Sequence, residues 1–464
     1  MRISPAKLVR GRAAVPGDKS ISHRAAMLAA VAEGGASRVS NFATSADCAS
    51  TLSCLAQLGV ELRREGSAVR IRGGSDLRAP DAPLDCGNSG TTMRLLAGLL
   101  AGRDFISTLT GDRSLRSRPM RRIIEPIDLM GGRVESREGR APLTVHGRDE
   151  LRAITYAPPV ASAQVKSCVL LGGLRAAGTT SVIERFGPTR DHTERLLRWF
   201  GVEVLTQRTT SSRPVGGSVP PGGAADAATG DGVGWPTAPD AQIVSIEGGG
   251  RLRARDVIVP GDISSAAFLL VAAAMLEGSD LTLEGVSLNP TRARVLEVLR
   301  ALGADVSAAD AREESNEPAG DIRVRGAGIL APSRAGANRI SGALSAALID
   351  ELPVLAVAGT RVEGGVEIRD AAELRVKESD RITATVLNLR AMGAEVEEHE
   401  GGLTVAGPVR LRGALVRSYG DHRVAMAAAV AALAAEGDTE IEGADCVSVS
   451  FPEFFPLLES IAVR

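Results

Sequence analysis

The stretch "VPGDKSISHR" at residues 15–24 returns in shortened form as "VPGDISS" at residues 259–265. Pro-Gly dipeptides mark turns, and the apolar residues after each turn predict a helix. Only the first copy carries cationic side chains, at Lys19 and Arg24. The repeated turn sequence predicts that one half of the chain begins near residue 16 and that a second half begins near residue 260. The alternative is chance, because Pro-Gly turns are common.

A second pattern, which occurs five times, argues against chance. A helix-like stretch ends in an apolar residue and a glycine, and a strand-like Val or Leu follows three positions later. The copies are "QLGVEL" (57–62), "LMGGRV" (129–134), "WFGVEV" (199–204), "ALGADV" (301–306) and "AMGAEV" (391–396). Glycine suits the C′ position of a helix, where φ is positive. Second strand-like runs follow several copies, namely "AVRIRG" (68–73), "PLTVHG" (142–147) and "GLTVAG" (402–407). The repeating unit is therefore predicted to be a helix, a glycine cap and a strand pair.

Two segments interrupt this spacing. Residues 207–240 are dense in Gly, Pro, Ser and Ala, so they are predicted to be an insertion that buries too little apolar surface to offset its ordering entropy. A milder insertion is expected at residues 309–321. Each half of the chain would then hold three units. The last segment, "PLLESIAVR" (456–464), predicts a sixth helix that is cut off before its strands.

Composition excludes several classes of protein. The 464 residues carry 54 basic and 56 acidic side chains, which argues against a general nucleic-acid binder. The five cysteines form no CxxC pair and the five histidines lack ligand spacing, so neither a disulfide framework nor a metal site is expected. The apolar runs are too short to cross a bilayer, and residues 1–15 contain no apolar h-region, so we expect no secretory signal. We expect a cytoplasmic protein.

Several predicted helix starts combine a cation with small polar residues. Ser20 and Arg24 are four residues apart and so share one helix face. Free backbone N–H groups at a helix start favour an anion, to which Lys19, Ser20 and Arg24 would add donors. The alternative is an ordinary surface helix capped by Asp18 or Ser20. Because the second copy of the turn lacks Lys and Arg, the turn itself does not need them, which favours a phosphate or carboxylate site.

Six further stretches join charged residues to predicted helices: "DCGNSGTTMR" (85–94), "DRSLRSRPMRR" (112–122), "ASAQVKS" (161–167), "IDELPVLAVA" (349–358), "LRVKESDRI" (374–382) and "GDHRVAMAAAVAAL" (420–433). Backbone N–H groups at Gly90 could approach an anion, although Gly-Asn-Ser is also ordinary turn chemistry. For most of the arginines at 112–122 the alternative is a solvated face. For Lys377 and Arg381, four residues apart, the alternative is a helical ion-pair ladder. There is no GxGxxG or GxxxxGK[ST] motif.

Taken together and in this order, these stretches resemble the family of 5-enolpyruvylshikimate-3-phosphate synthases, or 3-phosphoshikimate 1-carboxyvinyltransferases, within the enolpyruvyl transferases. The resemblance runs from about residue 5 to the C-terminus, apart from the two insertions. The matching segments are "PGDKSISHR", "GNSGTTMR", "RPM", "SAQVKS", "IDELP", "VKESDR", "DHR" and "SFPEFF".

This resemblance implies an α/β fold: a two-domain inside-out α/β barrel with three βαβαββ repeats in each domain. The chain would cross between the domains twice, near residues 15–18 and 259–262. One domain would comprise residues 1–16 and 261–464, and the other residues 17–260 with the flexible insertion 207–240. The active site would lie in the cleft between the domains.

The resemblance also implies the reaction, which transfers the enolpyruvyl group of phosphoenolpyruvate to the 5-hydroxyl of shikimate 3-phosphate and releases phosphate. By position, phosphoenolpyruvate would be bound by Lys19, Gly90, Arg118, Gln164, Arg381 and Arg423. Shikimate 3-phosphate would be bound by Lys19, Ser20, Arg24, Ser162, Ala163, Gln164, Asp350 and Lys377. The catalytic residues would be Asp350 as the base at the 5-hydroxyl, Glu378 as the acid at the phosphoenolpyruvate methylene, and Lys19. We expect a monomer with no cofactor, no metal, no nucleic-acid partner and no membrane association.

Two positions depart from the family pattern. Some members carry a Lys just before the late "FP", where this chain has Ser450, so one phosphate contact is missing or is supplied elsewhere. Some members have an Asn where this chain has Glu373, four residues before Lys377. A carboxylate there must accept a hydrogen bond or lie away from the substrate charges.

Three rival functions share parts of this pattern. UDP-N-acetylglucosamine enolpyruvyl transferases share the fold, but they usually carry a reactive Cys where this chain has Arg113. A non-catalytic anion-binding protein on the same scaffold would be expected to lose Asp350 or Glu378, and both are present. An RNA-processing cyclase of related architecture would need a basic surface and a nucleotide site, and the sequence indicates neither.

Overall fold

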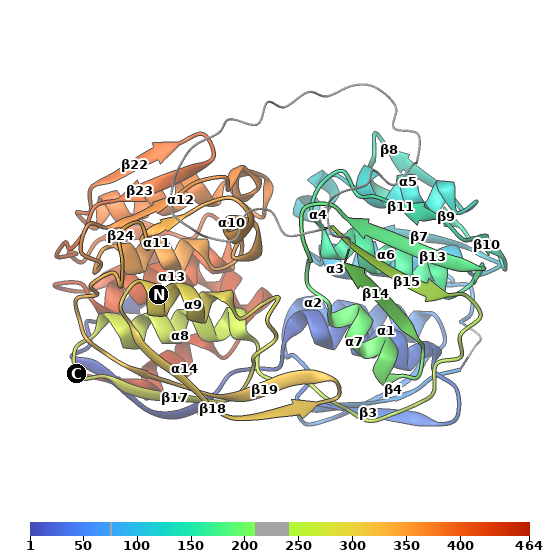
Figure 1. Ribbon diagram of the computed structural model, residues 1–464, viewed down its shortest axis with the longest axis horizontal. Coiled ribbons are helices and arrows are strands. Elements are labelled where there is room, and N and C mark those ends of the chain that lie inside the picture. Colours follow the sequence, from blue (N-terminus) through green and yellow to red (C-terminus); the bar gives the residue numbers. More distant parts are fainter. Residues whose placement is uncertain (75–76, 209–240) are drawn as a thin grey trace.

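The chain folds into two lobes that lie side by side (Figure 1). The computed structural model describes residues 1–74, 77–208 and 241–464. One cluster of buried apolar side chains draws on residues 21–259, and we call the lobe around it the N-terminal lobe. A second cluster draws on residues 3–15 and 263–461 and forms the core of the C-terminal lobe. Of the insertion predicted at 207–240, residues 207 and 208 end a strand, and the rest lies outside the described residues.

The helices of the N-terminal lobe are α1 (Lys19–Val31), α2 (Ala46–Gln57), α3 (Gly90–Ala101), α4 (Arg113–Ser117), α5 (Arg121–Leu129), α6 (Ala163–Gly173) and α7 (His192–Trp199). Those of the C-terminal lobe are α8 (Ile263–Met275), α9 (Arg294–Ala301), α10 (Ala343–Ala347), α11 (Leu352–Gly359), η1 (Ala372–Val376), α12 (Arg381–Ala391), α13 (His422–Leu433), η2 (Ala444–Val449) and α14 (Phe454–Ile461).

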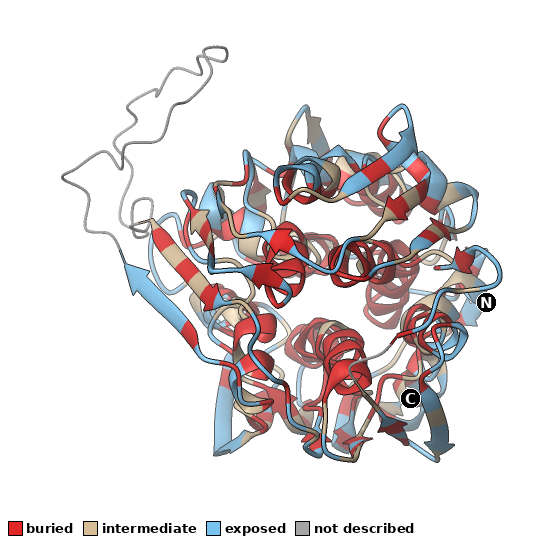
Figure 2. Cartoon of the chain, turned by 90° about the vertical axis from the view of Figure 1, so that its right-hand side faces the viewer, coloured by how far each residue is buried: buried red, intermediate tan, exposed pale blue. Residues whose placement is uncertain are grey.

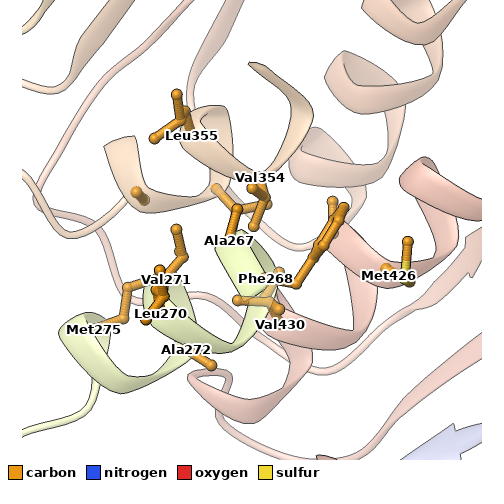
Figure 3. Close-up of a cluster of buried hydrophobic side chains, with 14 of the residues drawn as sticks. Ala267, Phe268, Leu270, Val271, Ala272, Met275, Val354, Leu355, Met426 and Val430 are labelled. Carbon is orange, nitrogen blue, oxygen red and sulfur yellow. The ribbon is translucent and has the colours of Figure 1, made fainter. Parts of the chain in front are cut away.

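Some of these helices are buried on every side. Every residue of α8, α11 and α13 is buried, and these three helices pack against one another around Phe268, Val354 and Val430 (Figure 3). Their sequences are apolar all round, as expected of helices that no face exposes to water. Small residues allow close approach, because a Cβ on Gly98 of α3 would lie only 2.2 Å from the carbonyl oxygen of Cys168 in α6. Figure 2 shows such buried helices inside and strands with exposed faces outside.

Four sheets share one arrangement, in which the first two strands are parallel and the others antiparallel. The orders are β16-β3-β5-β4, β6-β7-β9-β8, β11-β13-β15-β14 and β20-β21-β23-β22. Their strands are β3 (Ala36–Ser40), β4 (Glu61–Glu65), β5 (Ala68–Arg72), β6 (Leu84–Asp85), β7 (Ile106–Thr110), β8 (Arg133–Arg137), β9 (Arg140–His146), β11 (Thr155–Tyr156), β13 (Thr179–Glu184), β14 (Val204–Arg208), β15 (Gln242–Glu247), β16 (Val257–Ile258), β20 (Arg339–Ile340), β21 (Val366–Ile368), β22 (Val396–His399) and β23 (Gly402–Val405).

The N-terminus completes the remaining sheets of the C-terminal lobe. These are β18-β19-β17-β2-β26 and β1-β25-β24, and a small sheet of β10 and β12 lies in the N-terminal lobe. Their strands are β1 (Arg2–Ile3), β2 (Leu8–Ala14), β10 (Leu151–Arg152), β12 (Ala176–Ala177), β17 (Asp280–Ser287), β18 (Asp305–Glu314), β19 (Glu317–Arg325), β24 (Leu415–Arg417), β25 (Thr439–Glu442) and β26 (Ala462–Val463). The predicted last helix is confirmed as α14. The expectation that it is cut off before its strands is wrong, because β26 follows it and pairs with β2.

The glycine caps predicted from the sequence are confirmed. The five glycines each lie two residues beyond a helix and have φ between +87° and +98°. They are Gly59, Gly131, Gly201, Gly303 and Gly393. A strand follows each of them, because the positive φ ends the helix and turns the chain back.

The two copies of the turn lie against each other. The amide of Asp18 donates to the carbonyl of Pro260 at 2.8 Å, and the amide of Asp262 donates to the carbonyl of Pro16 at 2.9 Å. The two chain segments that join the lobes therefore form a short antiparallel bridge. The milder insertion expected at 309–321 is also regular: it is part of the long hairpin β18–β19.

Candidate functional site

The first copy of the turn places Lys19 at the start of α1. Asp18 is the N-cap, since its side chain accepts from the amide of Ile21 at 2.9 Å. The Nζ of Lys19 lies 3.0 Å from Oδ2 of Asp47, at the start of α2. Burial lowers the pKa of Lys19. The neighbouring carboxylates, chiefly Asp47, raise it by a larger amount in total, so the net shift is upward. Lys19 therefore stays protonated at pH 7, and its ammonium group is held between the starts of α1 and α2.

Arg24 is a buried cation whose hydrogen-bond partners are neutral. Its guanidinium donates to the hydroxyl of Thr193 at 2.7 Å, the hydroxyl of Ser167 at 2.9 Å and the carbonyl of Ser20 at 2.8 Å. Burial lowers the pKa of Arg24 to about 10. The sequence expectation that Ser20 and Arg24 share one helix face is confirmed. A charge this well buried, with none of the described carboxylates in an ion pair with it, is suited to bind an anion.

Gly90 is the first residue of α3, behind the N-cap Ser89. A Cβ built on Gly90 would lie 2.9 Å from Nη1 of Arg94 and 3.6 Å from Nη1 of Arg118. Arg118 is held by Asn88, whose Oδ1 accepts from its Nη2 at 2.7 Å. The sequence predicted that backbone near Gly90 faces an anion site, and the structure brings two guanidinium groups to that point.

The start of α6 carries three of the expected residues. Ser162 is its N-cap and accepts from the amide of Val165 at 3.3 Å, and Ala163 is the first helical residue. Gln164 lies in the first turn, where its Oε1 accepts from Nη1 of Arg94 at 2.6 Å. The structure thus joins Gln164 to the cluster around Gly90.

The stretch 374–382 is not one helix, so the alternative of a helical ion-pair ladder is wrong. The 3₁₀ helix η1 ends at Val376, and α12 begins at Arg381 with Asp380 as its N-cap. The Nζ of Lys377 donates to Oε1 of Glu373 at 3.3 Å. Glu373, the departure from the family pattern, therefore accepts a hydrogen bond as the sequence required.

Arg381 is the centre of the charged network in the C-terminal lobe. Only 2% of its side chain is exposed. Its Nη2 donates to Oε2 of Glu378 at 2.6 Å, its Nη1 to Oδ1 of Asp350 at 3.4 Å, and its Nε to Oδ2 of Asp421 at 2.7 Å. These carboxylates raise the pKa of Arg381 above its ordinary value despite burial. One guanidinium thus contacts both carboxylates that the sequence singled out.

The two carboxylates are ionised in the ligand-free protein. Burial raises the pKa of Asp350, but Arg423, Arg190, Lys377 and Arg381 together hold it well below the ordinary value. Burial likewise raises the pKa of Glu378, and the guanidinium groups around it, with Arg381 as the largest contributor and Arg118 beside it, more than reverse this, so the net shift is downward.

Arg423 lies at the start of α13 beside the same carboxylates. Its Nη1 donates to the carbonyl of Asp350 and to the hydroxyl of Ser264, both at 2.9 Å. Its neighbour His422 is buried, which lowers the pKa of that imidazole to about 4, and the nearby Lys19 contributes. His422 is therefore neutral at pH 7 and adds no charge to the site.

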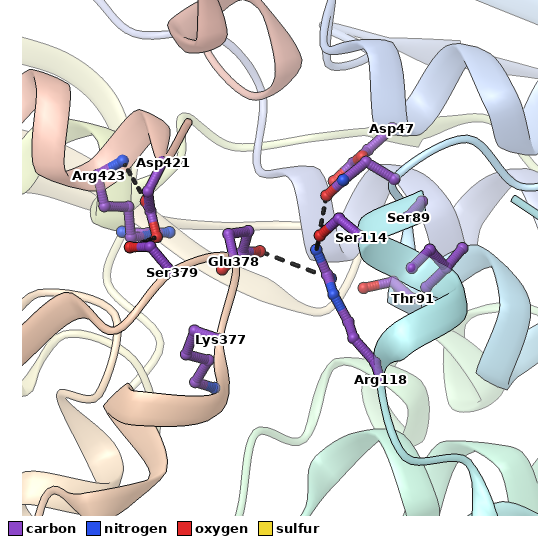
Figure 4. Close-up of polar contacts among 12 residues, drawn as sticks. Asp47, Ser89, Thr91, Ser114, Arg118, Lys377, Glu378, Ser379, Asp421 and Arg423 are labelled. Carbon is purple, nitrogen blue, oxygen red and sulfur yellow. Dashed lines mark hydrogen bonds and ion pairs between the residues drawn. The ribbon is translucent and has the colours of Figure 1, made fainter. Parts of the chain in front are cut away.

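Two ion pairs connect the lobes at this site. The Nη1 of Arg118, from the N-terminal lobe, lies 3.6 Å from Oε1 of Glu378 in the C-terminal lobe (Figure 4). The Nη2 of Arg190, from the N-terminal lobe, donates to Oδ2 of Asp350 at 2.6 Å. The cations of one lobe thus face the carboxylates of the other.

Comparison with known proteins identifies the family of this chain. The family model of EPSP synthase (3-phosphoshikimate 1-carboxyvinyltransferase) matches residues 3–225 and 232–458. The chain belongs to the EPSP synthase family. It is 49% identical to the 3-phosphoshikimate 1-carboxyvinyltransferase of Koribacter versatilis and 48% identical to that of Pelotomaculum thermopropionicum. Each alignment covers 100% of this chain and 99% of the relative. The chain also resembles the solved EPSP synthase of Acinetobacter baumannii, with a TM-score of 0.82, 38% identity and coverage of 100% and 98% of the two chains.

Sequence reasoning missed several residues that line the site of this EPSP synthase family member. Asp47 pairs with Lys19, Arg94 with Gln164, and Arg190 with Asp350. Arg94 stood within the quoted "GNSGTTMR". Arg190 had a weaker signal, since "TRDH" (189–192) places a cation and an Asp before a helix in the manner of "GDHR" (420–423).

The described residues contain no group of three or more His, Cys, Asp or Glu side chains placed to hold a metal ion. They also contain no helix that is long and apolar enough to cross a membrane. All five cysteines are free thiols.

Proposed function

We propose that this chain transfers the enolpyruvyl group of phosphoenolpyruvate to the 5-hydroxyl of shikimate 3-phosphate and releases inorganic phosphate. Membership of the EPSP synthase family and the names of the relatives support this reaction. The observation that carries it is the contact of one buried guanidinium, Arg381, with both Asp350 and Glu378. A proton acceptor and a proton donor are thereby held beside the cations that two anionic substrates need.

Electrostatics explains the number of cations. Two phosphates and two carboxylates repel one another strongly when they meet in a site of low dielectric constant. Preorganised guanidinium and ammonium groups offset that repulsion without reorganising during the reaction. We assign Lys19, Gly90, Arg118, Gln164, Arg381 and Arg423 to phosphoenolpyruvate. We assign Lys19, Ser20, Arg24, Ser162, Ala163, Gln164, Asp350 and Lys377 to shikimate 3-phosphate.

The two carboxylates would move the protons. Asp350, ionised by its cationic neighbours, accepts the proton of the 5-hydroxyl as the oxygen bonds to C2 of phosphoenolpyruvate. Glu378 delivers a proton to C3, which becomes a methyl group. Glu378, then ionised, takes a proton back from that methyl group while the bond between C2 and the phosphate oxygen breaks, and phosphate leaves. Glu378 must first be protonated, and the bound substrate anions favour this because they neutralise Arg118 and Arg381, which otherwise lower its pKa.

The missing Lys near Ser450 has a replacement in this proposal. Ser450 follows η2, which contacts α2 of the N-terminal lobe. Arg94 and Arg190 supply positive charge from the N-terminal lobe instead, since each contacts a residue assigned to substrate, Gln164 and Asp350 respectively.

We further propose the domain organisation that the resemblance implies. One domain comprises residues 1–16 and 261–464 and the other residues 17–260, each an inside-out barrel of three βαβαββ repeats. The two separate apolar clusters, the wholly buried helices and the shared order of the sheets support it. We also propose that the protein works as a monomer in the cytoplasm, because each chain carries both sides of the site and its cysteines are unpaired.

A phosphate-release assay tests the reaction. Phosphate should appear when shikimate 3-phosphate and phosphoenolpyruvate are both present, and Asp350→Asn should lower turnover at least about 100-fold. UDP-N-acetylglucosamine serves as the control acceptor for the rival transferase. Release only with the sugar nucleotide would overturn the assignment.

A further inference from the structure

The hairpin β18–β19 of the C-terminal lobe reaches onto the N-terminal lobe (Figure 1). At its tip, the hydroxyl of Ser315 accepts from the amide of Ile258 at 2.9 Å. The Nδ2 of Asn316 donates to the carbonyl of Arg195 at 3.2 Å, and Nη1 of Arg195 donates to the carbonyl of Asn316 at 2.9 Å. The tip is thus fastened to α7 and to β16, next to the second crossing between the lobes.

Behind the tip lies a polar cluster without access to solvent. Glu317, His192 and Asn289 are all 0% exposed. One carboxylate oxygen of Glu317 lies 2.7 Å from Nδ1 of His192, and the other accepts from Nδ2 of Asn289 at 2.9 Å. The same Nδ2 donates to Oδ1 of Asp191 at 2.7 Å. Buried polar groups of this kind keep one geometry. If they moved apart, a donor or acceptor would remain buried without a hydrogen-bond partner, which costs free energy.

Three consecutive residues at the start of α7 are therefore bound by the opposite lobe. Arg190 contacts Asp350, Asp191 contacts Asn289, and His192 contacts Glu317. The backbone of these three residues belongs to the N-terminal lobe, whereas their side chains contact residues of the C-terminal lobe. Because Arg190 adjoins Asp191, the bonds of Asn289 and Glu317 limit where its guanidinium can lie.

We propose that Glu317 and Asn289 are positioning residues for the reaction, which hold Arg190 against Asp350 by fixing Asp191 and His192. This rests on the proposed function, in which Asp350 binds the 5-hydroxyl of shikimate 3-phosphate. The hairpin thus holds Arg190 against Asp350 across the boundary between the lobes. Loss of the cluster would leave Arg190 free to drift, which weakens shikimate 3-phosphate binding more than phosphoenolpyruvate binding.

A double-mutant cycle between Glu317 and Arg190 tests this. Arg190→Ala should lower kcat/KM for shikimate 3-phosphate by about 100-fold, and Glu317→Ala by about 10-fold. If Glu317 acts through Arg190, the double variant should match Arg190→Ala within about 2-fold. The KM for phosphoenolpyruvate should change less than about 3-fold in Glu317→Ala. Losses that multiply, or equal changes in both KM values, would mean that the cluster only fastens the lobes and would overturn the proposal.

The hairpin offers its own control. Arg312 and Glu314 form an exposed ion pair on β18, with Nε 2.6 Å from Oε1. Glu314→Ala should leave kcat/KM within about 2-fold of the parent protein. If Glu317→Ala does not fold, the cycle is run with Glu317→Gln, which keeps the shape and one oxygen acceptor. With Glu317→Gln as well, the double variant should match Arg190→Ala within about 2-fold.

Hydrogen exchange separates this proposal from the proposed function. Amides of residues 187–195 should exchange at least about 10-fold faster in the Glu317 variant than in the parent, whatever the reaction turns out to be. Unchanged protection there would refute the positioning role. If the parent protein released no phosphate from the two substrates, the proposed function would fail while the exchange result still decided the role of the hairpin.

Discussion

The ammonium group of Lys19, at the start of α1, lies 3.0 Å from the carboxylate of Asp47, whereas the helix after the second copy of the turn begins without a cation. There the equivalent residue is Ile263, which is fully buried in the C-terminal core. Both copies keep the aspartate N-cap and the same backbone turn. The fold therefore needs the aspartate and not the lysine, and Lys19 is available for chemistry.

Lys19→Ala should lower turnover by more than about 100-fold, because the cation that we assign to both anionic substrates is lost and Asp47 is left unpaired. Thermal unfolding should change little. Both are measured on one preparation, by phosphate release and by calorimetry. Lys7→Ala, at an exposed position, is the matched control and should behave as the parent. Near-normal turnover in Lys19→Ala would remove the role assigned to it.

Stability should fall as the pH falls from 6.5 to 4. The imidazole of His422 has its pKa lowered from 6.5 to about 4, with burial as the largest cause. Below pH 6.5 the unfolded chain takes up a proton there, whereas the folded chain does not until about pH 4, so folding loses up to about 3 kcal/mol across this range. Asp350, whose pKa is depressed, adds a loss at still lower pH.

His422→Gln should flatten that decline. The measurement is the free energy of unfolding in urea at several pH values, compared between the variant and the parent. The variant should lose less stability between pH 6.5 and 4. Identical slopes in the two proteins would contradict the buried, neutral imidazole.

A buried triad under the site should matter for folding. The Nζ of Lys166 lies 3.1 Å from Glu184 and 2.5 Å from Glu194, and both carboxylates are almost fully buried. Lys166→Met would leave two buried carboxylates without a cation and should destabilise the protein by about 3–5 kcal/mol in urea unfolding. The control is Arg323→Ala, which breaks the half-exposed pair with Asp280 and should cost no more than about 1 kcal/mol. Equal losses in the two variants would be evidence against a special role for the triad.

The local structure could be predicted from the sequence because its signals are local. A glycine with positive φ ends a helix whatever surrounds it, so the caps at Gly59 and Gly393 were found. The ordered motifs placed Asp350 and Glu378 among candidates, and Arg381 does contact both. The break between Lys377 and Arg381 was missed, although Asp380 carried the signal of an N-cap.

Contacts between segments far apart in the chain could not be predicted. Arg190 and Asp350 are separated by 160 residues, and nothing near either one indicates the other. The same holds for Lys19 and Asp47, and for the pairing of β2 with β26. The interrupted spacing of the repeats predicts an insertion at 309–321. The sequence gives no sign that Glu317 in this segment is buried, because its partners His192 and Asn289 lie elsewhere in the chain. Such contacts depend on how the two lobes meet.

Gly90→Ala should reduce sensitivity to glyphosate, an analogue that the family resemblance places in the phosphoenolpyruvate site. The added Cβ would lie 2.9 Å from Nη1 of Arg94 and 3.6 Å from Nη1 of Arg118. Because both contacts are with the far ends of flexible side chains, the fold should tolerate the methyl group while the space between the guanidinium groups shrinks. The inhibition constant for glyphosate should rise more than the KM for phosphoenolpyruvate. Equal inhibition constants for the variant and the parent would contradict this.

Deleting residues 209–238 should leave catalysis largely unchanged. The strands on either side, β14 and β15, pair in antiparallel register up to Arg208 and Gln242. The deletion leaves three residues between this last pair, Pro239 to Ala241, which is a common length for a hairpin loop. The deleted residues lie outside those that the structure describes, and their sequence has Gly, Pro and Ala where a core needs Leu, Val and Ile.

Shortening a loop lowers its closure entropy only with the logarithm of its length, so the deletion should stabilise the protein by no more than about 1–2 kcal/mol. Turnover and urea unfolding are measured for the deletion and for a second variant in which residues 209–238 are replaced by a Gly-Ser sequence of equal length. Both variants should turn over within about 3-fold of the parent, since the hairpin register and not the inserted sequence sets the ends of β14 and β15. A deletion that folds normally but loses more than about 10-fold in turnover, or about 1.4 kcal/mol of barrier, would mean that the segment takes part in catalysis. A loss in the Gly-Ser variant as well would show that sequence, and not length, is what the reaction uses.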